Sequence, residues 1–321
     1  MIVTVTLNPL LERRYTYERI NYPGSNREGK VLIQAGGKGI NVNRQLNLLG
    51  TPGLSFTFLG GNNGKHLRDI LQREGINFTA VKTHAETREG VVLIDEKNGH
   101  AASLFGDNAD ISQEETDEFR EKLDKIIQNC EIVIFSGSSP CKSTDSLIPF
   151  GITAAGKYDK ISICDTYGKH LQDCINAGPT ILHNNIDELR NSLDIELDSE
   201  DSILSFMDGL YKKGIKQSYL TDAEKVFYSS NFDFHFRVTP PAVKTFDSTG
   251  SGDSFMAGII YGWHNDLTFE EGLKLAVSLG ALNASRKDVS NVPWNDAEEL
   301  MSMIEVVPIG KKMKTLDVTP R

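Results

Sequence analysis

The chain contains the segment Asp247-Ser248-Thr249-Gly250-Ser251-Gly252-Asp253-Ser254-Phe255, followed by an apolar helical pattern over residues 256–260. Two glycines directly before a helix let successive backbone N–H groups converge, and the helix dipole adds positive potential at that point. This predicts an anion hole at Gly250, Ser251 and Gly252. Asp253 would repel a bound anion, but it is well placed to accept a proton from a neighbouring hydroxyl. Taken alone, the segment fits a glycine-rich turn with Asp253 as a helix N-cap equally well.

A second glycine-rich segment, residues 36–43, precedes another helical pattern and reads Gly36-Gly37-Lys38-Gly39-Ile40-Asn41-Val42-Asn43. Its glycines allow a ligand to approach the backbone closely. Lys38 supplies a point charge and Asn41 both a donor and an acceptor, which suits a polyhydroxylated, phosphorylated substrate. A flexible turn with a solvated lysine is the alternative. The segment is not a Walker A loop, and no dinucleotide fingerprint follows the first predicted strand.

Outside these segments, short β-branched runs alternate with amphipathic stretches, which predicts an α/β fold with a central, mainly parallel sheet flanked by helices. Ser112 and Glu115 form a predicted capping box. The predicted strands are Ile2–Thr6, Leu54–Phe58, Ile132–Phe135, Ile161–Cys164, Thr180–Leu182 and Ser218–Leu220. The predicted helices are Gly39–Leu49, His66–Glu74, Ile111–Gln128, Ser202–Lys212, Gly252–Trp263, Phe269–Ser285 and Asn295–Ile304.

Two regions interrupt this alternation, at about residues 11–35 and 87–105, where short runs alternate at the period of strands. We expect them to form a small β-sheet that projects from the main sheet as a lid. From Gly252 onward helices are expected to the end of the chain, with a frayed tail at Lys311–Lys314. The absence of repeats and Pro-rich linkers favours a single domain over residues 1–321.

Composition narrows the classes of partner. The chain has 34 Lys and Arg against 44 Asp and Glu, a net charge of −10, which argues against a nucleic-acid partner. The sequence shows no apolar run long enough to cross a bilayer and no signal-peptide pattern, so no membrane association and a cytoplasmic location are expected. The spacing of the four cysteines favours reduced thiols over a disulfide or metal set. The positions are Cys130, Cys141, Cys164 and Cys174.

The two glycine-rich segments, together with Thr6-Leu7-Asn8-Pro9, resemble the ribokinase-like (PfkB) carbohydrate kinase family over nearly the whole chain. The chain is most similar to the sugar-phosphate branch that includes 1-phosphofructokinase and tagatose-6-phosphate kinase. The resemblance implies a ribokinase-like fold with a β lid and ATP and Mg²⁺ as cofactors. It implies phosphorylation of D-tagatose 6-phosphate or D-fructose 1-phosphate to the 1,6-bisphosphate. The lid sheet is also an expected homodimer surface, because an apolar sheet face needs cover.

The resemblance also assigns roles to residues of this chain. Asp253 would be the general base, and Gly250, Ser251 and Gly252 would hold the transferred phosphoryl group. Lys38 and Arg88 would hold the phosphate already on the substrate, and Asn185 with Glu188 would hold Mg²⁺ through water. The remaining substrate-binding residues would be Glu12, Gly36, Gly37, Asn41, Ser136 and Gly137. The remaining nucleotide-binding residues would be Thr221, Glu224, Ser248 and Asn283.

Several positions depart from the family pattern. Glu12 replaces the family's aspartate, Gly90 replaces an asparagine, and His183 and the turn at 220–224 are atypical. The acceptor and the nucleotide preference are therefore left open by the sequence. Two alternatives follow: a kinase of another small sugar or a nucleoside, and a sugar-phosphate-binding protein with weakened catalysis. The monovalent-ion requirement and the oligomeric state are also left open.

Overall fold

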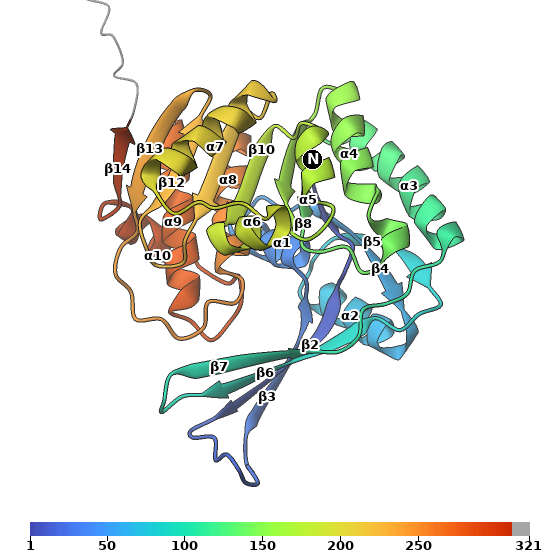
Figure 1. Ribbon diagram of the computed structural model, residues 1–321. Coiled ribbons are helices and arrows are strands. Elements are labelled where there is room, and N and C mark those ends of the chain that lie inside the picture. Colours follow the sequence, from blue (N-terminus) through green and yellow to red (C-terminus); the bar gives the residue numbers. More distant parts are fainter. Residues whose placement is uncertain (310–321) are drawn as a thin grey trace, which may run out of the picture.

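The computed structural model describes residues 1–309 and contains a large and a small β-sheet (Figure 1). The large sheet has ten strands in the order β14-β13-β12-β11-β10-β9-β8-β1-β4-β5. Its strands from β11 to β5 pair in parallel, whereas β11 through β14 pair antiparallel. The strand bounds are β1 (Ile2–Thr6), β4 (Leu54–Gly60), β5 (Phe78–Thr83), β8 (Ile132–Ser136), β9 (Ile161–Asp165), β10 (Ile181–Asn185), β11 (Gln217–Thr221), β12 (Phe227–Asn231), β13 (Phe234–Thr239) and β14 (Glu305–Ile309).

Helices cover both faces of the large sheet, as the alternation of elements predicts. Neighbouring side chains of β1 show the two layers: Val3 and Val5 pack into the core with α3, whereas Ile2 packs with α1 and α8. The helices of the first layer are α3 (Gln113–Gln128), α4 (Leu147–Lys157), α5 (Leu171–Asn176), α6 (Ile186–Leu193) and α7 (Glu200–Lys212). Those on the opposite side are α1 (Lys38–Leu48), α2 (Gly61–Arg73), α8 (Ser251–His264), α9 (Phe269–Ala284) and α10 (Trp294–Met301).

The small sheet projects from the large one, as Figure 1 shows, and has the order β3-β2-β6-β7. Its strands match the two regions predicted to form it, with Leu10 and Gly36 just outside the first region. Pairing places Glu12, Gln34, Gly90 and Phe105 side by side on one face, called the inner face because Glu12 and Phe105 also line the cleft described below. The bounds are β2 (Leu10–Tyr17), β3 (Lys30–Gly36), β6 (Arg88–Asp95) and β7 (His100–Phe105).

The carboxyl-terminal region corrects one prediction. Helices were expected to the end of the chain, and the last was predicted to run to Ile304. Instead α10 ends at Met301 and is followed by β14, which pairs with β13 at the edge of the large sheet. Pro308 removes a donor from β14, which an edge strand tolerates. The predicted tail at Lys311–Lys314 lies outside the described residues.

The structure also tests the predicted capping box, the start of α2 and the state of the cysteines. The capping box of Ser112 and Glu115 is present at the start of α3. Helix α2 begins at Gly61, five residues before its predicted start. All four cysteines carry free thiols, and Cys141 is the one that is partly exposed. Within residues 1–309, no helix combines the length and apolar character that a bilayer crossing requires.

Candidate active site

A cleft of about 450 Å³ opens at the carboxyl ends of the parallel strands, where ligands of open α/β sheets bind. The last residues of four strands line it, namely Thr6, Ser136, Asn185 and Thr221. The small sheet contributes further lining residues from β2, β6 and β7. The cleft therefore lies between the two sheets and brings together segments far apart in the sequence.

The start of α8 forms one wall of the cleft. Gly250 precedes the helix with φ +79° in the left-handed region, and no side chain caps the first turn. A Cβ at this position would lie 2.3 Å from Cγ1 of Val289, so only glycine fits. The first N–H groups of a helix lack partners within the helix. Gly250, Ser251 and Gly252 all line the cleft, so the start of α8 offers a site for an anion, although the Ser251 N–H also donates to the carbonyl of Ser248 at 3.1 Å.

Asp253 stands in the same helical turn and is only 4% exposed. Its Oδ2 accepts a hydrogen bond of 2.8 Å from Nδ2 of Asn41. Burial raises the pKa of Asp253 to about 7, and the nearby Lys38 ammonium offsets only part of that effect. A carboxyl group that titrates near neutral pH inside a cleft has the property that a general base needs.

Asn41 is held in a fixed orientation. Its Oδ1 accepts a hydrogen bond of 2.7 Å from Nη1 of Arg44, which directs the amide donor toward Asp253. Arg44 is itself held by the Glu74 carboxylate at 2.9 Å and by the carbonyl of Ala35 at 2.6 Å. Arg44 is a supporting residue that sequence reasoning missed, although it follows Asn41 by three positions on the same helix.

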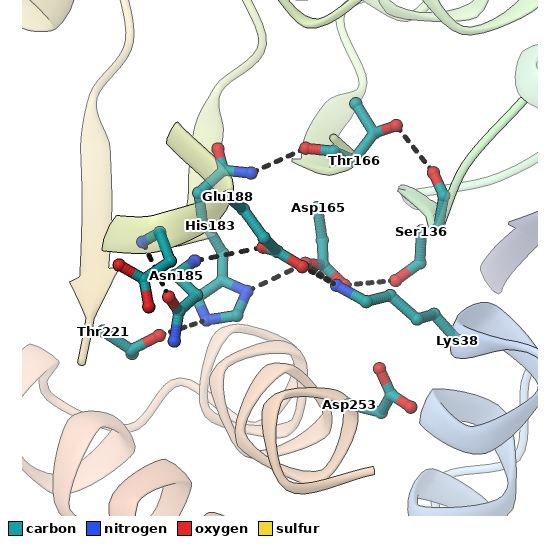
Figure 2. A network of polar contacts seen from close by, with 12 residues as sticks. Lys38, Ser136, Asp165, Thr166, His183, Asn185, Glu188, Thr221 and Asp253 are labelled. Carbon is teal, nitrogen blue, oxygen red and sulfur yellow. Dashed lines mark hydrogen bonds and ion pairs between the residues drawn. The ribbon is translucent and has the colours of Figure 1, made fainter. Parts of the chain in front are cut away.

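Lys38 is the centre of a buried polar network (Figure 2). Its Nζ lies 3.2 Å from Oδ1 of Asp165 and 3.2 Å from Oε1 of Glu188. Burial opposes the charge of Lys38, but the two carboxylates outweigh burial and raise its pKa. The predicted contact of Lys38 with a substrate phosphate therefore competes with two carboxylates that already hold the ammonium group.

Asp165 is fully buried and is held from three directions. Besides Lys38, it meets Nδ1 of His183 at 2.9 Å and accepts a hydrogen bond from the Ser136 hydroxyl. Burial favours the neutral acid, yet Lys38 and His183 outweigh burial and lower the pKa of Asp165. His183 Nε2 lies 3.3 Å from Oγ1 of Thr221. The atypical His183 thus links the centre of the cleft to the strand end predicted to contact the nucleotide.

Asn185 and Glu188 form a capping box at the start of α6. Oδ1 of Asn185 accepts from the N–H of Asp187 at 2.8 Å, and Oε2 of Glu188 accepts from the N–H of Asn185 at 3.1 Å. Both residues nevertheless line the cleft, and Oε1 of Glu188 faces Lys38. A single carboxylate with an amide oxygen fits Mg²⁺ held mainly through water and phosphate oxygens.

Arg88 is a cation without an acidic partner. No carboxylate in residues 1–309 lies within ion-pair distance of its guanidinium group, whose Nε is buried without a hydrogen-bond partner. Nη1 donates to Oδ1 of Asn108 at 3.2 Å, and Nη2 donates to the carbonyl of Asn8 at 3.4 Å. The Cζ atom of Arg88 lies 5.4 Å from the centre of the Phe105 ring. Arg88 therefore has unused donors and an unbalanced charge at the cleft.

Most of the predicted site residues line this cleft. Of those the structure describes, Gly36 and Asn283 are not among the lining residues. Asn283 was expected to contact the nucleotide, but its amide donates to the carbonyl of Thr249 and to the Ser251 hydroxyl. The predicted residues in the lining are Glu12, Gly37, Lys38, Asn41, Arg88, Ser136, Gly137, Asn185, Glu188, Thr221, Glu224, Ser248, Gly250, Ser251, Gly252 and Asp253.

Sequence reasoning missed an apolar part of the cleft. It flanks Thr221, Glu224 and Ser248, the residues expected to contact the nucleotide, and its own members are small or apolar. They lie on separate segments without a shared motif, so no local signal marks them. Their positions are Ala223, Phe227, Pro240, Pro241, Val243, Val277, Ala281 and Ala284. A pocket with an apolar end and convergent polar groups is typical of small-molecule sites.

The fold and the cleft define a class of enzyme. A helix N-terminus that can hold a phosphoryl group, beside a buried carboxylate of raised pKa, is the arrangement of a small-molecule kinase. The chain belongs to the pfkB family of carbohydrate kinases, whose model matches residues 10–296. The protein is therefore a phosphotransferase that acts on an alcohol group, and membership of the family implies ATP as the donor.

Individual relatives agree with this assignment. The chain is 28% identical over 319 residues to tagatose-6-phosphate kinase from Staphylococcus epidermidis, covering 96% of this chain and 100% of the relative. It is also 28% identical over 315 residues to 1-phosphofructokinase from Borreliella burgdorferi, covering 96% and 99%. Phosphofructokinase-2 from Escherichia coli has the same fold, with a TM-score of 0.86 at 22% identity over 94% and 98% of the two chains. The predicted family and fold class are confirmed.

Proposed function

We propose that this kinase transfers the γ-phosphoryl group of ATP to a ketohexose monophosphate, D-tagatose 6-phosphate or D-fructose 1-phosphate, and forms the 1,6-bisphosphate. The observation that carries the proposal is Arg88, an unpaired cation in the same cleft as Asp253. An arginine fork with free donors is well matched to a phosphate group. The names of the two 28% identical relatives favour the same class of acceptor.

Asp253 acts as the general base in this proposal. Its carboxylate takes the proton of a primary sugar hydroxyl as the hydroxyl oxygen bonds to the γ-phosphorus and the bond from that phosphorus to the ADP oxygen breaks. Asn41 keeps the carboxylate oriented at 2.8 Å. Backbone N–H groups at the start of α8, around Gly250–Gly252, stabilise the charge on the transferred group because the helix fixes their positions beside Asp253.

Glu188 and Asn185 are the residues proposed to hold Mg²⁺, through water. When bound, the ion would neutralise charge on the phosphates of the nucleotide. Glu188 is available for this only if Lys38 releases it, since the two side chains are 3.2 Å apart. Lys38 would then turn its ammonium toward phosphate oxygens while keeping its contact with Asp165.

The small sheet serves as a lid in this proposal. Leu10 and Glu12 on β2, Arg88 on β6 and Phe105 on β7 all line the cleft. Closure of these strands over the bound acceptor would exclude water from the reacting groups. This role accounts for the position of the apolar Phe105 ring beside the cationic Arg88 side chain.

The outer face of the small sheet is proposed as a homodimer surface. Pairing places Ile33 beside Arg13 and Leu104 beside Val91, on the face opposite Glu12. Val31, Ile33 and Leu104 are 51%, 43% and 57% exposed. An apolar sheet face of this kind favours contact with a second copy of the chain, since burial of apolar area drives association.

Sedimentation velocity tests the dimer. The wild-type chain should sediment as a dimer and Ile33→Glu as a monomer. Leu48→Glu, which changes a comparably exposed leucine on α1, is the matched control and should remain dimeric. A wild-type monomer at micromolar concentration would reject the proposed surface.

A coupled ADP-release screen with ATP and Mg²⁺ tests the function. Phosphorylated and free ketohexoses and a nucleoside serve as acceptors, and Asp253→Asn is measured beside the wild type. Turnover restricted to a ketohexose monophosphate and lost in Asp253→Asn supports the proposal. Turnover with a free sugar or nucleoside indicates the other kinase, whereas binding without ADP release indicates a sugar-phosphate-binding protein.

A further inference from the structure

The inner face of the small sheet carries a buried arginine that no predicted role explains. Arg14 follows Glu12 by two positions on β2, so both side chains lie on the same face. Arg14 is 2% exposed, and the carboxylates of Glu12 and Asp247 beside it are nearly as buried. Nη1 donates to Oε1 of Glu12 at 3.0 Å, and Nη2 donates to Oδ2 of Asp247. One guanidinium group thus joins the small sheet to the loop before α8.

Glu12 is held from a second side. Gln34 lies directly opposite it on β3, and its amide donates to the same Oε1 at 2.7 Å. Arg14 and Gln34 therefore both donate to the same carboxylate oxygen of Glu12. Because Glu12 lines the cleft, the other oxygen is the one that remains for an acceptor hydroxyl.

Asp247 connects the same arginine to the anion hole. While Oδ2 accepts from Arg14, Oδ1 accepts from the backbone N–H of Thr249 at 3.0 Å and from its hydroxyl at 2.9 Å. These bonds shape the turn that leads directly into Gly250. A shift of Arg14 would therefore move the peptide groups of Gly250–Gly252 through Asp247.

We propose that Arg14 is a positioning residue that sets the separation between the acceptor carboxylate of Glu12 and the phosphoryl site at Gly250–Gly252. The inference rests on the proposed function and on the predicted role of Glu12 in binding the acceptor. In-line transfer needs the attacking oxygen and the phosphorus within a near-attack distance, and a displacement of about 1 Å costs roughly 100-fold in rate. Arg14 contributes to the rate through geometry and touches neither substrate.

The planar fork of arginine is suited to this task. Two N–H groups on different nitrogens reach two carboxylates that belong to separate segments of the chain. Lysine has one compact ammonium group and cannot hold both carboxylates in the same geometry. Arg14→Lys therefore keeps the charge while it loosens the link between the small sheet and the loop.

Steady-state kinetics of Arg14→Lys provides the first test. We expect kcat to fall about 10- to 100-fold while KM for MgATP changes less than about threefold, and ADP release to water to rise relative to sugar phosphorylation. Arg13→Lys is the matched control, because Arg13 lies on the outer face of the same strand and pairs with Glu89. If Arg14→Lys melts earlier but retains wild-type kcat and coupling, Arg14 is only structural and the inference is wrong.

Hydrogen exchange provides a test that does not depend on the acceptor. In Arg14→Lys and in Asp247→Asn, amides of residues 247–254 should exchange about tenfold faster than in Arg13→Lys. Unchanged exchange in both variants would overturn the inference even if the kinase activity is confirmed. Conversely, a wild type that phosphorylates no ketohexose phosphate rejects the proposed function, and faster exchange would still show that Arg14 orders the loop.

Discussion

Asp253 is subject to opposing influences that predict a pH dependence of activity. Burial raises its pKa to about 7, against the attraction of Lys38 and the hydrogen bond from Asn41. Since the ionised form is the base, kcat/KM should fall about tenfold per pH unit below pH ~7 and level off above it. Measurement of kcat/KM between pH ~5 and ~9 at saturating Mg²⁺ checks this. A profile without a break near neutral pH would show that another group limits the reaction.

The raised pKa of Asp253 also predicts the direction in which the free energy of unfolding changes with pH. The pKa of Asp253 is raised in the folded state, so the folded chain holds a proton that the unfolded chain has lost between about pH 4 and pH 7. The free energy of unfolding therefore decreases with rising pH across that window. Asp253→Asn should be more stable than the wild type at pH ~8 by roughly 1–3 kcal/mol and should lose activity about 10²- to 10⁴-fold.

Denaturant unfolding at two pH values separates this effect from a general change in stability. At pH ~5 the wild-type carboxyl is largely protonated, so the advantage of Asp253→Asn should shrink there. Asn41→Ala provides a contrast, because it removes a hydrogen bond that favours the ionised form of Asp253. An equal stability difference at both pH values would contradict a raised pKa.

At the residue scale, sequence reasoning was informative where neighbours in the chain are also neighbours in space. Gly250, Gly252 and Asp253 lie within one helical turn, so their spacing was enough to predict the anion hole and a nearby carboxylate. The partners of Lys38 could not be predicted in that way. Asp165 and Glu188 lie 127 and 150 positions away, and only the parallel packing of β9 and β10 brings them to Lys38.

At the scale of elements, the two glycines at the start of α8 should respond differently to substitution by alanine, one through stability and the other through catalysis. Gly250→Ala places a Cβ 2.3 Å from Val289 at a φ of +79° and should cost about 2–4 kcal/mol of stability. At Gly252 the nearest atom to a Cβ would be Cε1 of His183 at 3.4 Å, so Ala is tolerated by packing. Gly252→Ala should change stability by less than about 1 kcal/mol while its methyl group lowers kcat about 10- to 100-fold.

Thermal melts with kinetics on both variants check this contrast. Equal losses of stability would mean that the start of α8 does not have the described backbone. An unimpaired kcat in Gly252→Ala would show that phosphoryl groups do not approach this wall of the cleft. The two glycines thus separate a requirement of the fold from a requirement of the reaction.

Elements with strong periodicity were predicted well, and those that depend on long-range pairing were not. Strand β8 carries a continuous apolar run, and all residues of β1 and β8 are buried, as expected for a sheet covered on both faces. Strand β14 has mixed polarity and contains Pro308, so its pairing with β13 decides its structure. Helix α2 starts with Gly61 and Gly64, which resemble a turn until Gly60 and Thr87 fix the backbone there.

At the scale of the whole molecule, the positive charge of Arg88 in the cleft contrasts with the negative net charge of the chain. The chain carries −10, yet Arg88 has no acidic partner within residues 1–309. Local geometry outweighs a distant acidic surface because charges beyond about 8–10 Å are largely screened at physiological salt. Composition could therefore exclude nucleic acid as an expected partner but could not show where a small anion would bind.

The rise in melting temperature on ligand binding tests whether Arg88 holds the phosphate of the substrate. At about 100 times its Kd, a ligand that binds only the folded state adds about 2.7 kcal/mol. D-tagatose 6-phosphate and MgADP should each raise the melting temperature of the wild type. Arg88→Gln should abolish the increase with the sugar phosphate and keep that with MgADP, because glutamine can still contact Asn108 but carries no charge. Arg13→Gln, on the outer face of the same sheet, should retain both increases, and a sugar phosphate that still stabilises Arg88→Gln fully must be held by another cation.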